Sequence, residues 1–158
     1  MRAGITVPVR KALVPEIKQV HLLINEFARH YEMLPRSLSD LYSHARDIFV
    51  FEKNNEILGV CALHVLWEDL AEIRSLAVKE KYQGKGIGEA LVKRCVSEAE
   101  KLGVPKVFAL TYVPEFFKKL GFDEVRRSRL PKRIRGDCIN CHKFPDCDEH
   151  AMIKVTGE

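Results

Sequence analysis

Apolar residues near the start of the chain recur at the spacing of one helix face. They are Ile17, Val20, Ile24, Phe27, Ala28 and Tyr31. Pro15 suits the first turn of such a helix, and Leu34-Pro35 marks its expected end, because the residue before a proline is disfavoured in a helix. A strand over Thr6–Ala12 is predicted before it, and Ser37 is expected to cap a short helix over Leu38–His44.

The middle of the chain changes to strand-like runs. These cover Ile48–Glu52, Ile57–Leu66 and Leu70–Val78. Turn residues separate them, Asn54-Asn55 first and Trp67-Glu68-Asp69 second, so the runs predict an antiparallel meander.

Helical spacing returns after the meander. An amphipathic helix is expected to open at Gly86 and close at Gly103, with Ile87, Leu91, Cys95, Ala99 and Leu102 on its apolar face. A fifth strand over Lys106–Thr111, a short helix from Pro114 to Gly121 and a closing strand over Asp148–Val155 complete the pattern. We therefore predict an α/β (α+β) fold with a mixed, mostly antiparallel sheet flanked by helices.

Composition favours one domain over residues 1–158, with a basic and cysteine-containing C-terminal segment at 126–158. The most apolar windows, such as Ile57–Leu66, end within about ten residues, short of the roughly 20 that cross a bilayer. The first residues lack an apolar signal core, so a cytoplasmic location without a membrane partner is expected.

The five cysteines are an odd number, and we expect reduced thiols, with Cys61 and Cys95 as small core residues. The net charge of +4 is too small to indicate a nucleic-acid partner, but it suits a polyanionic small ligand. A homodimer is compatible with this composition.

A glycine-rich turn, Gln83-Gly84-Lys85-Gly86-Ile87-Gly88, lies between the third strand of the meander and the long helix. Such a turn directs several backbone amides at one point, where the helix dipole adds positive potential. Side chains at the glycines would hold an anion away or forbid the backbone angles, and Lys85 adds charge. A diphosphate site is predicted here, and a plain helix start is the alternative.

With these residues on the page, the sequence resembles the GNAT superfamily of acetyltransferases. The resemblance depends on Leu76-Ala77-Val78, on Gln83 to Gly88 as a Gln/Arg-x-x-Gly-x-Gly/Ala motif, and on Phe116–Phe122, in family order. It implies a GNAT fold and direct acyl transfer from acetyl-CoA to an amine. It also implies that the diphosphate of acetyl-CoA binds the loop at Gln83, Gly84, Lys85, Gly86, Ile87, Gly88 and Glu89, and that the pantetheine pairs with the backbone of Leu76, Ala77 and Val78.

Within that superfamily the chain resembles the acetyltransferase domain of the N-acetylglutamate synthases. The similar segments are Leu34–Ser37, Asp47–Val50, Ala71–Val78 and Leu110-Thr111. The resemblance implies acetylation of the α-amine of L-glutamate, the first committed step toward arginine. The bifunctional synthases carry an amino-acid-kinase-like domain for which 158 residues leave no room, so we expect a short stand-alone form, and feedback by arginine is in doubt.

The chemistry requires a base, because an α-amine is mostly protonated at neutral pH. Glu72 is the candidate, since it lies in mid-strand and matches the family's catalytic glutamate by resemblance; the alternative is a solvated strand residue. For the proton of the leaving thiolate, many members use a tyrosine where this chain has Phe117. Tyr112, Thr111 or water are the candidates instead, and Tyr112 is also explained as a half-buried aromatic at a strand end.

A dicarboxylate substrate is expected to pair with arginine. Arg36 follows Pro35 in a segment that, by resemblance, lines the amino-acid pocket. Arg74 is two residues from Glu72 and therefore on the same strand face. The alternative for both arginines is a surface ion pair.

The C-terminal segment begins with six basic residues, Arg126, Arg127, Arg129, Lys132, Arg133 and Arg135. They are interpreted as a solvated loop, as contacts for substrate carboxylates, or as an RNA contact, although interleaved aromatics for base stacking are missing. Four potential zinc ligands follow, Cys138, Cys141, Cys147 and His150. Reduced cysteines or a redox-sensitive pair are the alternatives, and zinc is not the expectation.

Acetylation of another small amine or of a protein amine is the catalytic alternative to glutamate. A non-catalytic acyl-CoA sensor and a nucleic-acid-associated module are the alternatives from other classes.

Overall fold

The structure, a computed structural model, describes residues 8–31, 33–130 and 149–157. In this part the chain forms one seven-stranded sheet. The strands are β1 (Val9–Lys11), β2 (Ile48–Lys53), β3 (Glu56–Trp67), β4 (Leu70–Val78), β5 (Lys106–Thr111), β6 (Asp123–Val125) and β7 (His150–Val155). The α-helices are α1 (Ile17–His30), α2 (Leu38–Ser43), α3 (Ile87–Lys101) and α4 (Pro114–Lys119), and the 3-10 turns are η1 (Val14–Glu16), η2 (Ala45–Asp47), η3 (Glu80–Tyr82) and η4 (Arg127–Arg129).

The sheet has the strand order β1-β2-β3-β4-β5-β7-β6. Neighbouring strands are antiparallel except for β4 and β5, which are parallel. Asn54 and Asn55 turn from β2 into β3 with φ of 52° and 64°, which matches a tight hairpin turn. The predicted meander and the predicted fold class are therefore confirmed.

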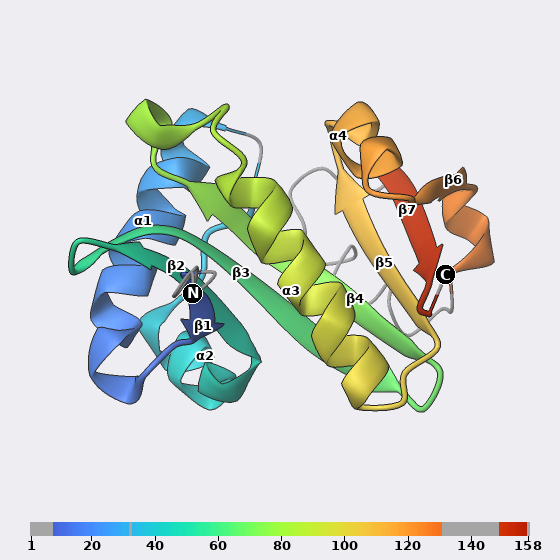
Figure 1. The fold of residues 1–158 in the computed structure, drawn as a ribbon, viewed down its shortest axis with the longest axis horizontal. Coiled ribbons are helices and arrows are strands. Elements are labelled where there is room, and N and C mark those ends of the chain that lie inside the picture. Colours follow the sequence, from blue (N-terminus) through green and yellow to red (C-terminus); the bar gives the residue numbers. More distant parts are fainter. Residues whose placement is uncertain (1–7, 32, 131–148, 158) are drawn as a thin grey trace, which may run out of the picture.

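Helices cover both faces of the sheet (Figure 1). Apolar residues of α1 and α2 pack with Ile48, Val50 and Val60 on one face. On the other face, α3 packs against Phe49 and Cys61, which alternate with them along β2 and β3. The sheet is thus the middle layer of three, and each strand face has its own core.

The first helix is shorter than the sequence predicts. It ends at His30, and Tyr31 is already extended, with φ of −134° and ψ of 162°. The amide of Asn25 on α1 donates to the Arg36 carbonyl at 2.9 Å, while its side-chain oxygen accepts from the Arg36 N–H at 3.0 Å. These two hydrogen bonds hold the segment that follows α1 against the helix. The segment between His30 and Pro35 is therefore a connection to α2 rather than a continuation of α1.

Strand β6 is missing from the predicted elements. It has three residues, of which Asp123 and Glu124 are exposed, so it carries no apolar pattern. Its pairing with β7, as in Val125 with Ala151, is formed over a long sequence separation. The closing strand β7 is found at His150–Val155, within the predicted range.

Cys61 and Cys95 are fully buried free thiols in the core between β3 and α3, as predicted. A hydrogen bond between the two thiols, together with burial, raises the pKa of Cys61 well above its ordinary value. The Cys61 thiol is therefore a poor nucleophile, and the burial of both cysteines is in keeping with a packing role.

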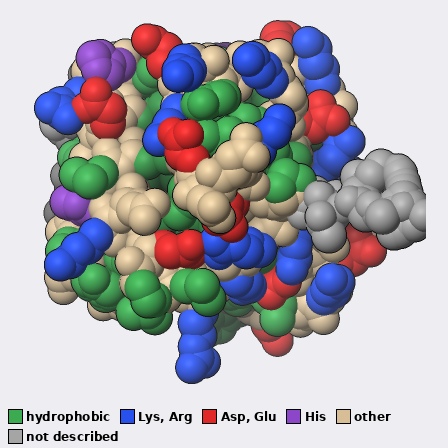
Figure 2. Space-filling view, turned by 60° about the vertical axis from the view of Figure 1, so that its left-hand side comes forward, with side chains coloured by type: hydrophobic (Ala, Val, Ile, Leu, Met, Phe, Trp, Pro, Cys, Tyr) green, Lys and Arg blue, Asp and Glu red, His purple; other side chains and the backbone are tan. Residues whose placement is uncertain are grey.

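The helices of the described residues include none that is long and apolar enough to cross a membrane. On the face shown in Figure 2, basic and acidic side chains are interspersed with hydrophobic ones. Pairs such as Arg29 with Glu26 on α1 bring opposite charges together. The positive charge is therefore not gathered into one stripe on that face.

Candidate active site

Strands β4 and β5 diverge soon after they meet. They pair at Ala71 with Val107 and at Glu72 with Phe108, and at no later position of the described chain. Figure 1 shows the two strands separating toward their carboxyl ends. Beyond Glu72, the edge of β4 that faces β5 therefore has backbone groups without a partner strand among the described residues.

A bulge in β4 accompanies this divergence. Ala77 pairs with Val60 and Arg74 with Ala62, so β4 has one residue more than β3 between these positions. Ser75 lies in the extra stretch with φ of 54°, an unusual value for a residue other than glycine. Bulges re-aim the strand and its side chains, and they occur often beside active sites.

The glycine-rich loop connects the end of β4 to α3, as predicted. Gly84 and Gly86 have φ of 76° and 87°, and a Cβ at either would point into open space. The Gln83 amide donates to the Val78 carbonyl at 3.0 Å and so ties the loop to β4. The first amides of α3 have no helical acceptor by geometry, so the loop presents donors and a positive dipole end to open space.

Gly88, at the second position of α3, has a different role. A Cβ there would lie 3.4 Å from the ring of Phe116 on α4. This distance is an ordinary van der Waals contact, so Gly88 lies where the first turn of α3 meets the Phe116 ring of α4. The predicted diphosphate loop therefore fits an anion on geometry, although its individual contacts remain predictions.

Glu72 and Arg74 lie on the same face of β4, as predicted. Arg74 Nε donates to Glu72 Oε1 at 2.6 Å, and their side chains are 17% and 12% exposed, respectively. Their cross-strand neighbours on β3 are His64 and Ala62, and Ala62 packs with the α1 side of the core. Glu72 is therefore a largely buried carboxylate rather than a solvated strand residue.

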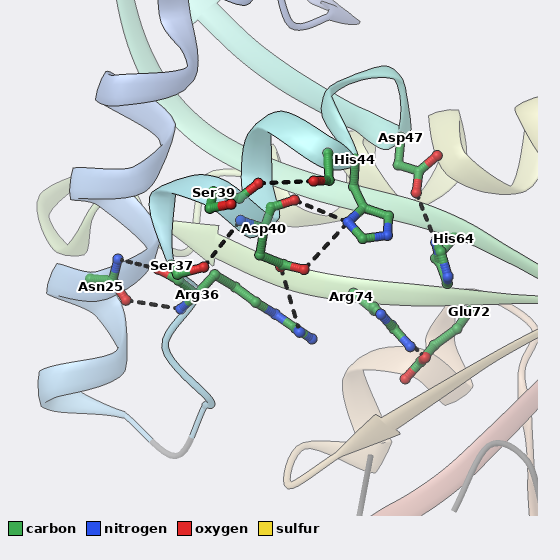
Figure 3. Close-up of polar contacts among 11 residues, drawn as sticks. Asn25, Arg36, Ser37, Ser39, Asp40, His44, Asp47, His64, Glu72 and Arg74 are labelled. Atoms are coloured by element: carbon green, nitrogen blue, oxygen red, sulfur yellow. Dashed lines mark hydrogen bonds and ion pairs between the residues drawn. The ribbon is translucent and has the colours of Figure 1, made fainter. Parts of the chain in front are cut away.

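Arg36 comes to this region from a different element. Its backbone is clamped by Asn25, and its guanidinium Nη1 lies 3.8 Å from Asp40 Oδ2 on α2. Ser37 caps α2 through its hydroxyl, which accepts from the Asp40 N–H at 3.0 Å. Figure 3 shows the Arg36 side chain pointing from the start of α2 toward Arg74 and Glu72.

Two histidines complete the group, and sequence reasoning missed them. His64 lies opposite Glu72 in the β3–β4 register, and its Nδ1 is 2.8 Å from Asp47 Oδ2 on η2. The ring of His44 meets the His64 ring edge-on at 4.9 Å and is itself held by Asp40 through Nδ1. The predicted antiparallel pairing of β3 with β4 could have pointed to His64, but the register shifts between these strands cannot be read from the sequence.

The candidates for the general acid lie at the end of β5. Thr111 is buried, and its hydroxyl accepts from the Val113 N–H at 2.9 Å. Tyr112 follows it directly and is half-buried. Phe117 is buried between Phe116 and Phe122, and its side chain has no hydroxyl that could donate a proton. The structure thus leaves Tyr112 and Thr111 as predictions.

Most of the proposed metal ligands and half of the basic run lie outside the described residues. These are Cys138, Cys141 and Cys147, and Lys132, Arg133 and Arg135. His150 is described in β7, where its Nδ1 lies 2.5 Å from Glu124 Oε2 and lowers the pKa of that carboxyl. The described part of the chain holds no group of three or more potential metal ligands. Zinc binding by this segment is therefore untested.

Comparison with known proteins gives one family. The model of the "Acetyltransferase (GNAT) family" matches residues 15–122. An uncharacterized N-acetyltransferase of Chlorobaculum tepidum is 38% identical over 147 residues, covering 93% of this chain and 95% of its own length. An amino-acid acetyltransferase of Mycobacterium tuberculosis is 37% identical over 129 residues, covering 80% and 74%.

A solved structure is similar over nearly the whole chain. It is the N-acetylglutamate synthase of Neisseria gonorrhoeae in complex with coenzyme A and N-acetyl-glutamate, with a TM-score of 0.87 and 26% identity. The match covers 98% of this chain and 36% of that one. The similarity thus concerns one part of a longer protein.

Proposed function

This chain belongs to the acetyltransferase (GNAT) family and is an acetyl-CoA-dependent N-acetyltransferase, and from that premise we propose that it acetylates the α-amine of L-glutamate. One observation carries the proposal. Arg36 and Arg74, from separate elements, are directed at the region of a largely buried carboxylate, Glu72. Two guanidinium groups near one base suit an amine that carries two carboxylates.

The donor fits the open side of the molecule. The amides at the start of α3 and the loop glycines suit the diphosphate. The edge of β4 at Leu76, Ala77 and Val78, which has no partner strand among the described residues, suits the amide groups of the pantetheine, which would extend the sheet as a short strand does. The thioester would then lie where β4 and β5 part, close to Glu72.

Acetyl-CoA supplies an acyl group activated as a thioester. Glu72 removes a proton from the substrate ammonium, and the amine nitrogen forms a bond to the acetyl carbon while the carbon–sulfur bond breaks. The coenzyme A thiolate takes a proton, for which Tyr112 is the proposed donor, and the second proton that the nitrogen loses restores the Tyr112 hydroxyl. Arg74 keeps Glu72 in place through Nε, so Arg36 is the principal partner proposed for the substrate carboxylates.

A panel of acceptors tests this proposal. Glutamate, aspartate, glutamine, glycine, lysine and short peptides are each incubated with acetyl-CoA, and free thiol is followed. We expect the largest kcat/KM for glutamate, since an acceptor that lacks one carboxylate can form fewer charge-assisted hydrogen bonds with the two guanidinium groups. A glutamate kcat/KM no larger than that of glycine or lysine would exclude the proposed acceptor, while turnover of any amine would still agree with the family.

A further inference from the structure

The proposed reaction releases a proton that must leave the site. An ammonium substrate gives up two protons when it becomes an amide, and the coenzyme A thiolate takes only one of them. One proton per turnover therefore passes from the base to solvent. The Glu72 side chain is 12% exposed and bonded to Arg74, so this transfer needs a path from a largely buried group.

His64 lies next to Glu72 on the adjacent strand. The two residues are directly opposite in the β3–β4 register, where Cβ atoms are about 4.5–5.5 Å apart and side chains share one face. His64 uses Nδ1 toward Asp47, so its Nε2 is on the other side of the ring. In the view of Figure 3 the His64 ring lies between Asp47 and Glu72.

Asp47 sets the state of this ring. A carboxylate beside Nδ1 favours the tautomer with its proton on Nδ1, and Nε2 is then a proton acceptor. Among the described residues, the other charged or titratable groups around His64 include His44 at the end of α2, Arg46 on η2, and Glu72 and Arg74 on β4, and Tyr42 of α2 lines the same hollow. An imidazole ring can take a proton on one nitrogen and release it again, which is why histidine serves as a proton shuttle.

His64 also lines an open hollow. The hollow has a volume of about 500 Å³ and is lined by His64, Asp47, His44, Arg46 and Tyr42 among others. The His64 and Asp47 side chains are 26% and 28% exposed. Water in this hollow can thus take a proton from the ring.

We propose that His64, oriented by Asp47, accepts the proton that Glu72 takes from the substrate and passes it to water in the hollow. Nε2 binds the proton, Glu72 returns to the carboxylate, and the imidazolium then loses this proton from Nε2 to water or buffer, which restores the starting tautomer. His64 acts through Glu72 and touches no reacting atom, so it is a relay and positioning residue. This inference depends on the proposed use of Glu72 as base, but not on glutamate as the acceptor.

Chemical rescue tests the relay. His64→Ala removes the ring and leaves space, and His64→Gln keeps a polar side chain beside Asp47. With the best acceptor of the panel, we expect kcat to fall by roughly 10-fold or more in both variants, with KM for both substrates changed less than about twofold. Imidazole at constant ionic strength should restore kcat of His64→Ala in a saturable way, because it replaces the proton carrier.

Controls separate this role from a structural one. His30→Ala removes an exposed histidine of α1 and should change neither kcat nor the response to imidazole. Asp47→Asn keeps the His64 ring but removes the carboxylate that orients it. We expect a smaller loss of kcat than in the His64 variants and an altered pH profile of kcat. This variant also tests the relay if the His64 variants do not fold.

Three outcomes would overturn the relay. An unchanged kcat in His64→Ala and His64→Gln, a loss of kcat that imidazole does not restore in folded His64→Ala, or a change confined to KM would each do so. If the wild-type protein acetylates no amine, the proposed function fails and the relay fails with it. Wild-type turnover with an unaffected variant removes the relay alone.

Discussion

Glu72, the proposed base, is largely buried and hydrogen-bonded to Arg74, unlike a solvated surface carboxylate. Glu72→Gln keeps the shape and removes the proton acceptor. We expect turnover to fall by roughly 10²–10⁴-fold. Steady-state kinetics with glutamate measure the loss, and calorimetry should show acetyl-CoA binding as in the wild type. Equal turnover across the pH range would remove Glu72 as the base.

Arg36 is the residue expected to decide the acceptor. Its backbone is clamped by Asn25, so its side chain starts from a fixed point. Arg36→Ala should raise KM for glutamate by roughly 10–100-fold, the range of one charge-assisted hydrogen-bonded pair, and leave KM for acetyl-CoA unchanged. The KM of Arg36→Lys for glutamate should lie between those of the wild type and Arg36→Ala, because lysine keeps the charge but cannot pair bidentately.

Arg29→Ala is the matched control for Arg36, since Arg29 is an exposed arginine of α1 paired with Glu26. Its glutamate KM should equal that of the wild type. An equal rise in both variants would mean that only the general charge of the surface matters.

The site was predictable from the sequence only where local spacing decides it. Glu72 and Arg74 are two residues apart in one strand, and this alone places them on one face. His64 and Asp47 belong to other elements, and two register shifts between β3 and β4 decide what lies opposite Glu72. A shift of one position reverses the face of a side chain, so the neighbour of Glu72 could not be read without the structure.

At the scale of elements, a substitution in the loop between β4 and α3 can distinguish a loss of acetyl-CoA binding from the cost of backbone strain. Gly86→Ala places a Cβ at φ of 87° in the space expected to hold the diphosphate. It should cost about 1–2 kcal/mol of stability and also weaken acetyl-CoA binding by roughly tenfold or more. Thermal unfolding and calorimetry measure the two effects.

Gly103→Ala is the matched control, because Gly103 has φ of 81° and open space around it at the other end of α3. It should lose similar stability and bind acetyl-CoA normally. If Gly86→Ala binds as well as Gly103→Ala, the loop does not hold the diphosphate.

The elements themselves followed from the sequence where their apolar pattern was long. The meander and α3 were predicted nearly at their observed bounds, because each carries a buried face of its own. β6 and the end of α1 were not, since they depend on long-range partners, Ala151 in one case and the Arg36 backbone in the other.

At the scale of the whole molecule, an ion-pair cluster ties the N-terminal strand to the rest of the fold. Arg10 on β1 pairs with Glu16 of η1 at 2.6 Å and with Glu52 of β2 at 2.8 Å. Its guanidinium hydrogen bond lowers the pKa of Glu16. A carboxyl with a lowered folded pKa stabilises the fold above its unfolded pKa of about 4.3, and this stability is lost as the pH falls through the lowered value.

Glu16→Gln should therefore lower Tm at pH 7 by roughly 2–4 °C, which corresponds to about 1 kcal/mol or less for this partly exposed cluster. The difference from wild type should shrink as the pH is lowered from about 5 toward 3. Thermal unfolding over this range tests it. Glu56→Gln, which removes an exposed pair with Lys79, should leave Tm unchanged at pH 7, and a pH-independent effect of Glu16→Gln would contradict the electrostatic cause.

The two paired positions between β4 and β5 have a consequence for how the molecule exchanges its amide hydrogens. Without a ligand, the amides of β4 that point toward β5 beyond Glu72 have no partner strand in the described part of the chain to protect them. Acetyl-CoA bound there would pair with this edge as an additional strand and would slow deuterium uptake at Leu76–Val78 first. It would also raise the free energy of unfolding by about 2.7 kcal/mol at a hundred times its Kd. Hydrogen-exchange mass spectrometry would show whether protection by acetyl-CoA appears first at Leu76–Val78. Protection that appears first in another segment would place the cofactor at that segment.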